Sequence, residues 1–491
     1  MKRTLLLGFL CLCIYSISFA QTKYKDDFLK SEFHKERRTT LRSMMPDNSV
    51  AVFFSNPIRN RANDTDFMYH QDPEFYYLTG HKEPHSLLLV FKDEIQFGAT
   101  KTNEIIFVRQ HNALKELYDG ARLGKEGAKD KLDINVAFEG PDFKDFNLDF
   151  SQFDKVMFYQ FKDDVRNHNE EGDLFSLISQ FKQKVGYNSN DLSIEPIKGN
   201  IDLVELDMIM TKMRGIKQSE ELDLLRKAVD ISTIAQSEVM KAMKPGLSEM
   251  EIQGLHEYIF KVYRAEYEGY NSIVGAGHNG CVLHYIDNYK AEIEDGELIL
   301  MDLGAEYHGY TADITRTIPV NGKFSPEQKQ IYDLVFEAQE AAMKICKPGV
   351  KFSDLYAATK EVINNGLVEL GIYKTTENKD IINPETGRNR YYPHGCCHHI
   401  GLDVHDKGEY DVLKENMVIT IEPGIYIPEN SPADQKWWNI PVRIEDDYLI
   451  TKDGCELLSD RAPRSSDEVE ALMAQPSAFD RIVLPALEQG N

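Results

Sequence analysis

The chain has 491 residues, of which 80 are acidic and 56 are basic, and its formal net charge is −24. This excess of negative charge argues against nucleic acids and anionic membrane surfaces as partners, because both are negatively charged themselves. Its seven cysteines include no Cys-x-x-Cys pair and are too few for a disulfide-dense fold. We therefore expect a large acidic protein that is stabilised by a hydrophobic core.

Residues 1–20 have the pattern of a signal peptide. The basic pair Lys2-Arg3 precedes an apolar run over residues 5–20, and Ser18-Phe19-Ala20 matches a small-x-small cleavage site. The run is shorter than the roughly 20 apolar residues that cross a bilayer, and charged sequence follows it at once. We expect an exported protein, periplasmic or secreted, with no membrane attachment after the signal peptide is cleaved.

Residues 21–200 are predicted to form one α/β domain. Apolar residues at helical spacing predict an amphipathic helix over 175–185. Short apolar runs between polar segments predict strands at 50–54, 86–91, 104–108 and 155–159. At the other end of the chain, residues 476–491 form a tail with no informative pattern.

Residues 201–475 are predicted to form a second domain built from two similar halves. Lys-Pro-Gly occurs at 244–246 and again at 347–349, each time between two predicted helices. In each half an apolar strand follows later and ends in an acid, Asp302 in the first half and Glu422 in the second, with glycine two positions further on. The repeat predicts an internally duplicated domain with a site where its halves meet.

The first half contains a predicted hairpin over residues 297–317 that carries two acids. If this hairpin turns about Tyr307-His308, then Asp302 and Asp313 lie directly opposite each other. Opposed side chains lie about 5 Å apart on one face of the sheet. Two like charges at that distance are unfavourable unless a cation lies between them. A divalent metal meets this need, and the alternative is a solvated hairpin with two scattered acids.

The second half repeats this arrangement and adds histidines. A turn about Ala433-Asp434 places Glu422 opposite Glu445, and residues 393–405 contain four histidines. Histidine is the commonest metal ligand. Four carboxylates with one imidazole form a donor set that favours manganese or cobalt over a structural thiolate zinc site. Carboxylates shared between ions imply two metals about 3.5–4 Å apart.

Short motifs occur in a characteristic order along the chain. An aromatic-rich segment that ends in Thr-Gly, residues 72–80, comes first. The later motifs are YNSIVG at 270–275, LHY at 283–285, DLG at 302–304, GYTADITRT at 309–317, GLDVH at 401–405, EPG at 422–424 and RIEDD at 443–447. Together they resemble the pita-bread metallopeptidases, which include methionine aminopeptidase, prolidase and aminopeptidase P, with the metal-free creatinase as a relative. The resemblance is greatest to aminopeptidase P and covers most of the chain.

This resemblance implies a fold and a metal set. The fold is α/β (α+β), with an amino-terminal creatinase/aminopeptidase P-type domain followed by a pita-bread domain with an internal pseudo-twofold duplication. The cofactors are two divalent ions, most readily Mn²⁺, with Co²⁺ or Zn²⁺ as alternatives. The implied ligands are Asp302 for one metal, His398 and Glu422 for the other, and Asp313 and Glu445 as bridges between them.

The resemblance also implies roles for residues that act on the substrate. Glu422 would accept the proton of the attacking water, Arg443 would orient the neighbouring acids, and Tyr270 would belong to the pocket for the free amino end. Substrate binding and stabilisation of the tetrahedral intermediate fall to three histidines, His284, His394 and His405. For each residue outside the metal set, the alternative is a structural role in packing or capping.

Two features beside the expected ligand His398 depart from the pattern. Cys396-Cys397 stands where small or apolar residues are expected, and we expect these thiols to pack, although oxidation is the alternative. His399 is a second candidate ligand, but its spacing to the GLDVH motif favours His398.

These observations predict an exported dinuclear-metal aminopeptidase that hydrolyses the bond between an N-terminal residue and a penultimate proline by attack of a metal-bound hydroxide. Its partners are peptides with proline at position two, and we expect a homo-oligomer, a dimer or a tetramer. One alternative is a prolidase, which cuts only Xaa-Pro dipeptides with the same metals. Another is a non-catalytic relative that binds peptides. A creatinase-like hydrolase is disfavoured, because it would not need the metal ligands.

Overall fold

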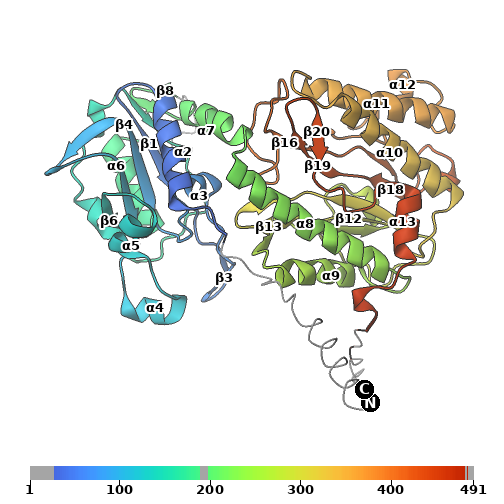
Figure 1. The fold of residues 1–491 in the computed structure, drawn as a ribbon, viewed down its shortest axis with the longest axis horizontal. Coiled ribbons are helices and arrows are strands. Elements are labelled where there is room, and N and C mark those ends of the chain that lie inside the picture. The colour runs from blue at the N-terminus through green and yellow to red at the C-terminus, as the bar shows by residue number, and fades with distance from the viewer. Residues whose placement is uncertain (1–26, 188–196, 482–483, 485–491) are drawn as a thin grey trace, which may run out of the picture.

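The computed structural model describes residues 27–187, 197–481 and 484 of the chain. The predicted signal peptide over 1–20 lies outside the described residues, as does most of the predicted tail. Figure 1 shows two parts side by side, an amino-terminal part in blue to green and a larger carboxy-terminal part in green to red. Each part combines helices with sheets, which confirms the predicted α/β class.

A mixed sheet of seven strands forms the centre of the amino-terminal part. In spatial order its strands are β6 (Ala137–Glu139), β5 (Thr100–Val108), β4 (Leu87–Phe97), β1 (Ser49–Phe54), β7 (Lys155–Met157), β9 (Ile201–Asp202) and β8 (Ile197–Lys198). The four predicted strands are confirmed as β1, β4, β5 and β7. The last of these strands along the chain is β9, which ends just past the predicted domain boundary at residue 200. The boundary itself stays a prediction.

Both faces of this sheet are covered. Ala51 of β1 belongs to one hydrophobic core together with Phe33 of α2, whereas Val52 belongs to a second core together with Phe181 of α6. Successive side chains of a strand point to opposite faces, so the unbroken apolar run from Val50 to Phe54 in β1 reflects burial on both faces. The helices of this part are α2 (Ser31–Met44), α3 (Pro73–Thr79), α4 (Ala113–Asp119), α5 (Gly124–Lys131) and α6 (Leu174–Val185), the last being the predicted helix over 175–185. A small hairpin joins β2 (Asn60–Ala62) to β3 (Thr65–Asp66).

The carboxy-terminal part begins with α7 (Glu205–Gly215) and contains the two predicted halves. The first half holds α8 (Ser219–Ala242), α9 (Glu249–Val262), β10 (Tyr267–Glu268), β11 (Ile273–Ala276), β12 (Leu298–Asp302), β13 (Ala305–Tyr307), β14 (Tyr310–Thr311) and β15 (Thr315–Pro319). The second half holds α10 (Pro326–Ile345), α11 (Phe352–Glu369), α12 (Asn378–Ile381), β16 (Val418–Ile421), β17 (Gly424–Ile427), β18 (Ile440–Arg443), β19 (Asp446–Ile450), β20 (Cys455–Leu457) and α13 (Ser466–Met473). In Figure 1 the helix pairs α8–α9 and α10–α11 flank the strands of this part.

A buried glutamine ties the first helix of the first half to its hairpin. The side-chain amide of Gln236 in α8 donates to the backbone carbonyls of Met301 and Ile314, at 3.1 and 3.0 Å. Met301 precedes Asp302 and Ile314 follows Asp313. The helix therefore bonds the backbone next to both predicted ligands of this half.

The second half uses a glutamine in the equivalent place. Gln339 in α10 donates to the carbonyls of Ile421 and Ile444, at 3.0 and 3.3 Å. These residues directly precede Glu422 and Glu445. The duplication thus extends from the order of the elements to single side chains.

The register of the first hairpin differs from the predicted one. Asp302 pairs with Thr315 and not with Asp313, because the chain turns about His308-Gly309 instead of Tyr307-His308. Both turn residues have positive φ, 54° and 93°, as in a type I′ hairpin turn. Asp313 is therefore two positions away from direct opposition. Since side chains alternate with a period of two, both acids still face the same side.

The second hairpin has the predicted register. One ladder pairs Ile421 with Asp446, and the next begins at Gly424, so Glu422 and Glu445 oppose each other between the two ladders. The sequence-based prediction was correct here because both ladders keep one register, centred on the predicted turn at Ala433-Asp434.

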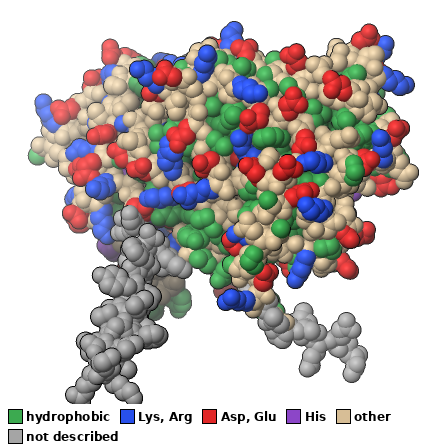
Figure 2. All heavy atoms as spheres, turned by 45° about the vertical axis from the view of Figure 1, so that its right-hand side comes forward, with side chains coloured by type: hydrophobic (Ala, Val, Ile, Leu, Met, Phe, Trp, Pro, Cys, Tyr) green, Lys and Arg blue, Asp and Glu red, His purple; other side chains and the backbone are tan. Residues whose placement is uncertain are grey.

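Charges of both signs are mixed on the surface. Figure 2 shows acidic and basic side chains interspersed over the face that it draws, with apolar side chains scattered between them. Among the described residues, no helix has both the length and the apolar composition that a membrane span requires.

A fully buried arginine holds the two halves together. Arg316 of β15 pairs with Asp446 of β19 at 2.6 Å and also donates to the carbonyl of Glu445 at 2.8 Å. Both side chains of the ion pair are inaccessible to solvent. A charge pair in such a place is costly to break, because the remaining partner stays buried without its counter-ion.

We predict that Arg316→Met lowers the free energy of unfolding by about 3–5 kcal/mol, since Asp446 loses its cation inside the protein. Urea unfolding followed by fluorescence measures this change. The control is Arg226→Met, whose partner Glu456 lies 2.6 Å away on the surface. That substitution should cost less than about 1 kcal/mol. Equal losses in the two variants contradict the prediction.

Candidate metal centre and active-site cavity

A cavity of about 640 Å³ opens where the two halves meet. All ten predicted site residues line it: Tyr270, His284, Asp302, Asp313, His394, His398, His405, Glu422, Arg443 and Glu445. They come from both halves of the carboxy-terminal part, so the fold brings together residues that lie far apart in the sequence. Their individual roles stay predictions.

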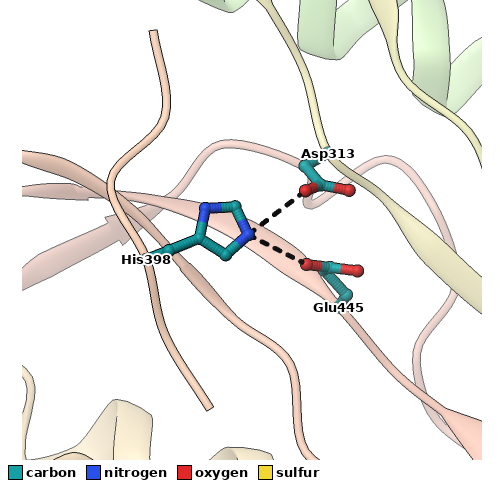
Figure 3. A group of neighbouring side chains, drawn as sticks. All are labelled: Asp313, His398 and Glu445. Atoms are coloured by element: carbon teal, nitrogen blue, oxygen red, sulfur yellow. Dashed lines mark ion pairs between the residues drawn. The ribbon is translucent and has the colours of Figure 1, made fainter. Parts of the chain in front are cut away.

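Asp313, His398 and Glu445 form the centre of this site. Each offers one ligand atom, and these atoms all lie within 4.8 Å of one another. His398 Nε2 lies 3.3 Å from Asp313 Oδ2 and 3.9 Å from Glu445 Oε1. Figure 3 shows the imidazole pointing toward both carboxylates. Glu422 Oε1 is 3.6 Å from the same nitrogen. One imidazole therefore faces three carboxylates.

The fourth carboxylate, Asp302, is joined to this group through Tyr270. The Tyr270 hydroxyl donates to Asp302 Oδ1 at 2.5 Å or to Asp313 Oδ1 at 2.6 Å. Arg443 binds the other oxygen of Asp302 and donates from Nε to Thr315 Oγ1 at 3.1 Å. These contacts connect Arg443 of the second half to Asp302 of the first, and the orienting role of Arg443 stays a prediction.

The buried acids raise one another's pKa. Burial, reinforced by the charges of Asp313 and Glu422, raises the pKa of Glu445 well above its usual range. Burial likewise raises the pKa of Glu422 to about 7. For His398, burial lowers the pKa, but its contact with Asp313 and the charge of Glu422 outweigh this and raise it to about 9. The group concentrates negative charge that divalent cations neutralise.

This donor set fits divalent metal ions. It consists of four carboxylates and one imidazole, with no thiolate within the described cluster. Carboxylate oxygen is the donor that manganese and similar ions prefer, and imidazole suits the borderline metals. Asp313, His398 and Glu445 are grouped closely enough to hold a metal ion, and the predicted ligands Asp302 and Glu422 line the same cavity.

The other histidines take distinct positions. His394 Nε2 lies 2.9 Å from the Tyr426 hydroxyl, and the ring of His405 meets that of His398 edge to face, with centroids 4.3 Å apart. His399 is fully buried and its Nε2 lies 3.2 Å from the carbonyl of Glu409. The structure thus places His398, and not His399, at the metal centre.

Sequence reasoning missed two residues that support the site. Tyr426 of β17 contacts both His394 and Arg443, the latter at 2.9 Å. Asp447 is fully buried and accepts the backbone N–H of Asp313 at 3.0 Å. Asp447 lies in the quoted RIEDD motif, which gave a signal for it, whereas Tyr426 looks like any aromatic residue of a buried strand.

Comparison with known proteins agrees with this geometry. Residues 223–452 match the model of metallopeptidase family M24, and residues 34–155 match that of the aminopeptidase P N-terminal domain. The fold and the buried Asp/His/Glu group are therefore those of an M24 metallopeptidase.

Full-length relatives narrow this class. The Xaa-Pro aminopeptidase of Escherichia coli (strain K12) is 33% identical over 452 residues, which cover 90% of this chain and 98% of the relative. That of Haemophilus influenzae is 35% identical over 455 residues, covering 90% and 97%. The chain belongs to the aminopeptidase P (Xaa-Pro aminopeptidase) family.

Solved structures support the same assignment. The structure of E. coli aminopeptidase P with the inhibitor Pro-Leu matches with a TM-score of 0.79 and 31% identity, over 91% of this chain and 98% of that one. Pseudomonas aeruginosa aminopeptidase PepP matches with a TM-score of 0.78 and 35% identity, over 91% and 99%. The predicted two-domain fold of this family is confirmed.

We predict that Mn²⁺ raises the unfolding temperature of the protein and that a chelator reverses the effect. A ligand at about 100 times its Kd stabilises the folded state by about 2.7 kcal/mol. Glu445→Gln should lose most of this stabilisation in a thermal-shift titration. Glu306→Gln, which changes a buried acid bound by His70 outside the described cavity, should keep it. An undiminished Mn²⁺ effect in Glu445→Gln contradicts the assigned centre.

Proposed function

We propose that this chain is an exported dinuclear Xaa-Pro aminopeptidase that removes the first residue of peptides whose second residue is proline. The observation that carries the proposal is the single cavity lined by all five metal-ligand candidates and by His284, His394 and His405. Family membership and the acidic centre support the peptidase activity. The finer points, which are the two ions, the preference for longer peptides, export and oligomerisation, are proposals.

The metal centre would be held by residues of both halves. Asp302 would serve one ion, His398 and Glu422 the other, and Asp313 and Glu445 both. Two divalent ions, most readily Mn²⁺ and alternatively Co²⁺ or Zn²⁺, supply Lewis-acid activation of a water molecule and polarise the scissile carbonyl. Glu422 is the acid at this centre that stands beside His394, 3.7 Å from its Nδ1. We assign to it the acceptance of the water's proton.

Recognition of proline rests on the histidines. The bond before proline has no amide N–H, so the enzyme cannot hold its substrate through that donor. His284, His394 and His405 offer ring nitrogens around the same cavity. A histidine within reach of the departing ring nitrogen can also return a proton to it. Tyr426 orients His394 for this work through the 2.9 Å contact.

The rival functions differ in substrate length and in catalysis. A prolidase would accept only the Xaa-Pro dipeptide, and a non-catalytic relative would bind peptides without cleaving them. The similarity to Xaa-Pro aminopeptidases over nine-tenths of the chain favours the aminopeptidase. The full set of ligand-type residues in one cavity disfavours the binding protein.

We predict that the Mn²⁺-loaded protein releases the first residue from an Xaa-Pro-Xaa tripeptide, and that a chelator abolishes this release. Liquid chromatography of the products against an Xaa-Pro dipeptide and an Xaa-Ala-Xaa control measures it. Cleavage of the dipeptide alone changes the assignment to prolidase. No cleavage of either peptide by protein with confirmed bound metal supports the binding protein.

Export and oligomerisation rest on separate observations. The basic start, apolar run and cleavage pattern of residues 1–20 support export. Association is supported by α4, none of whose residues is buried. Its side chains Leu114, Leu117 and Tyr118 are 65–79% exposed. Apolar side chains collected on a projecting helix are typical of surfaces that contact a partner, and we propose a second copy of this chain.

One purification tests both points. Expressed from its full sequence in a bacterial host, the protein should be recovered outside the cytoplasm with Gln21 as its first residue, as Edman sequencing would show. Light scattering should give a multiple of the monomer mass, and Leu117→Asp should reduce it. Recovery with Met1 intact contradicts export, and a monomer in the unsubstituted protein contradicts association.

A further inference from the structure

A group of six charges, four of them buried, lies where the amino-terminal part meets the carboxy-terminal part. We call it the seam cluster, and its members are Glu74, Arg214, Lys217, Asp403, Asp406 and Lys407. Glu74 belongs to α3 and Arg214 to α7, and Lys217 follows α7. The remaining three flank His405 in the segment that carries the GLDVH motif. None of the six takes part in the chemistry proposed above.

Arg214 and Lys217 hold this segment from one side. Arg214 Nη2 donates to Asp403 Oδ2 at 2.7 Å and also to Asp406. Lys217 Nζ donates to the second oxygen of Asp406 at 2.7 Å and to the carbonyl of Arg214 at 2.6 Å. The side chains of Arg214, Lys217 and Asp406 are at most 2% exposed. These bonds fix the backbone on both sides of His405.

Glu74 adds a contact from the amino-terminal part. Its Oε1 lies 2.8 Å from Lys407 Nζ and 3.7 Å from Arg214 Nη1. Glu74 lies in the aromatic-rich segment over 72–80, for which the metal chemistry gives no role. The seam cluster therefore connects that segment to the loop of a predicted catalytic histidine.

The His405 segment also has backbone contacts: the Asp406 N–H donates to the carbonyl of His399 at 2.9 Å, and the Gly401 carbonyl accepts the N–H of Thr311 at 2.9 Å. The segment borders two cavities, because Val404 and His405 line the active-site cavity while Asp403 and Lys407 line another of about 470 Å³. His405 itself is exposed. Apart from the edge-to-face contact of its ring with His398, its position depends on the flanking backbone.

The segment also approaches the cluster too closely for a side chain at Gly401. A Cβ atom there would lie 2.1 Å from Asp406 Oδ2 and 2.9 Å from Lys217 Nζ. The charges themselves are kept despite the cost of burying them. Burial raises the pKa of Asp406, but Arg214 and Lys217 outweigh it and hold that pKa below its usual value. Apolar residues of similar size often replace buried ion pairs without loss of stability, so a geometric role accounts better for these charges.

We propose that the seam cluster positions His405 in the active-site cavity, with Arg214 as its central positioning residue and Glu74 as the contribution of the amino-terminal part. The inference rests on the proposed function, since it assigns to His405 a role in binding or turning over the Xaa-Pro peptide. It makes the amino-terminal part a component of the catalytic apparatus through a specific contact.

The test is a double-substitution cycle with Arg214→Met and His405→Ala. The measured quantity is kcat/KM on an Xaa-Pro tripeptide at saturating Mn²⁺, normalised to the concentration of folded enzyme. Arg214→Met should lower kcat/KM by about 10–100-fold, as is usual for residues that support active-site groups. In the His405→Ala background the same substitution should have almost no further effect, because the two residues act as one unit. Arg214→Lys should recover part of the activity.

Arg38→Met is the matched control. Arg38 is also fully buried, and its Nε lies 2.9 Å from Glu104, away from the active-site cavity. This substitution should leave kcat/KM of the folded enzyme unchanged. Glu74→Gln keeps the size of the side chain and provides the same test if Arg214→Met does not fold.

Hydrogen–deuterium exchange gives a readout that does not need activity. Residues 401–408 should exchange faster in Arg214→Met and in Glu74→Gln, but not in Arg38→Met. The proposal is overturned if Arg214→Met lowers kcat/KM by the same factor in the His405→Ala background as in the unsubstituted enzyme. It is also overturned if hydrogen exchange is unchanged in both cluster variants. If the unsubstituted enzyme cleaves no Xaa-Pro peptide, the proposed function fails, and the exchange data still decide whether the cluster holds the segment.

Discussion

The concentration of negative charge at one point is the constraint on which the carboxy-terminal part depends. Asp302, Asp313, Glu422 and Glu445 line one cavity, and all of them except Glu422 are buried. Like charges at such distances oppose folding unless cations and donors surround them. Arg443 and the Tyr270 hydroxyl supply part of that compensation from the protein. The negative charge that these groups leave uncompensated makes the site suited to bind divalent ions.

Local pattern predicted most of this architecture. Apolar runs located the strands, the repeated Lys-Pro-Gly disclosed the duplication, and motif spacing identified the ligand candidates. The register of the first hairpin was wrong, because it depends on the positive φ of His308, which nothing in the sequence marks. Contacts between residues that lie far apart in the sequence could not be predicted either. Arg214 and Asp403 are 189 positions apart, and no periodicity connects them.

Several contacts connect the amino-terminal part to segments that carry site residues, and two of them lie next to the candidate site. Through Glu74 this part reaches the segment of His405. Through Tyr76 it reaches the turn of the first metal hairpin, where the hydroxyl donates to the carbonyl of His308 at 3.0 Å. A Cβ atom at Gly309 would lie 2.8 Å from the Tyr76 ring, so this turn and the amino-terminal part fit each other closely. The amino-terminal part thus packs against elements that carry the candidate site.

Two of the buried arginines, Arg316 and Arg443, connect the two halves of the carboxy-terminal part. Arg316 lies in the first half and pairs with Asp446 of the second, while Arg443 lies in the second half and binds Asp302 of the first. Each half therefore supplies a buried arginine that binds an acid of the other half. A half on its own would carry a buried arginine without its acid and buried acids without their arginine. Because each half buries a charge whose partner lies in the other half, the two halves are expected to fold as one cooperative unit.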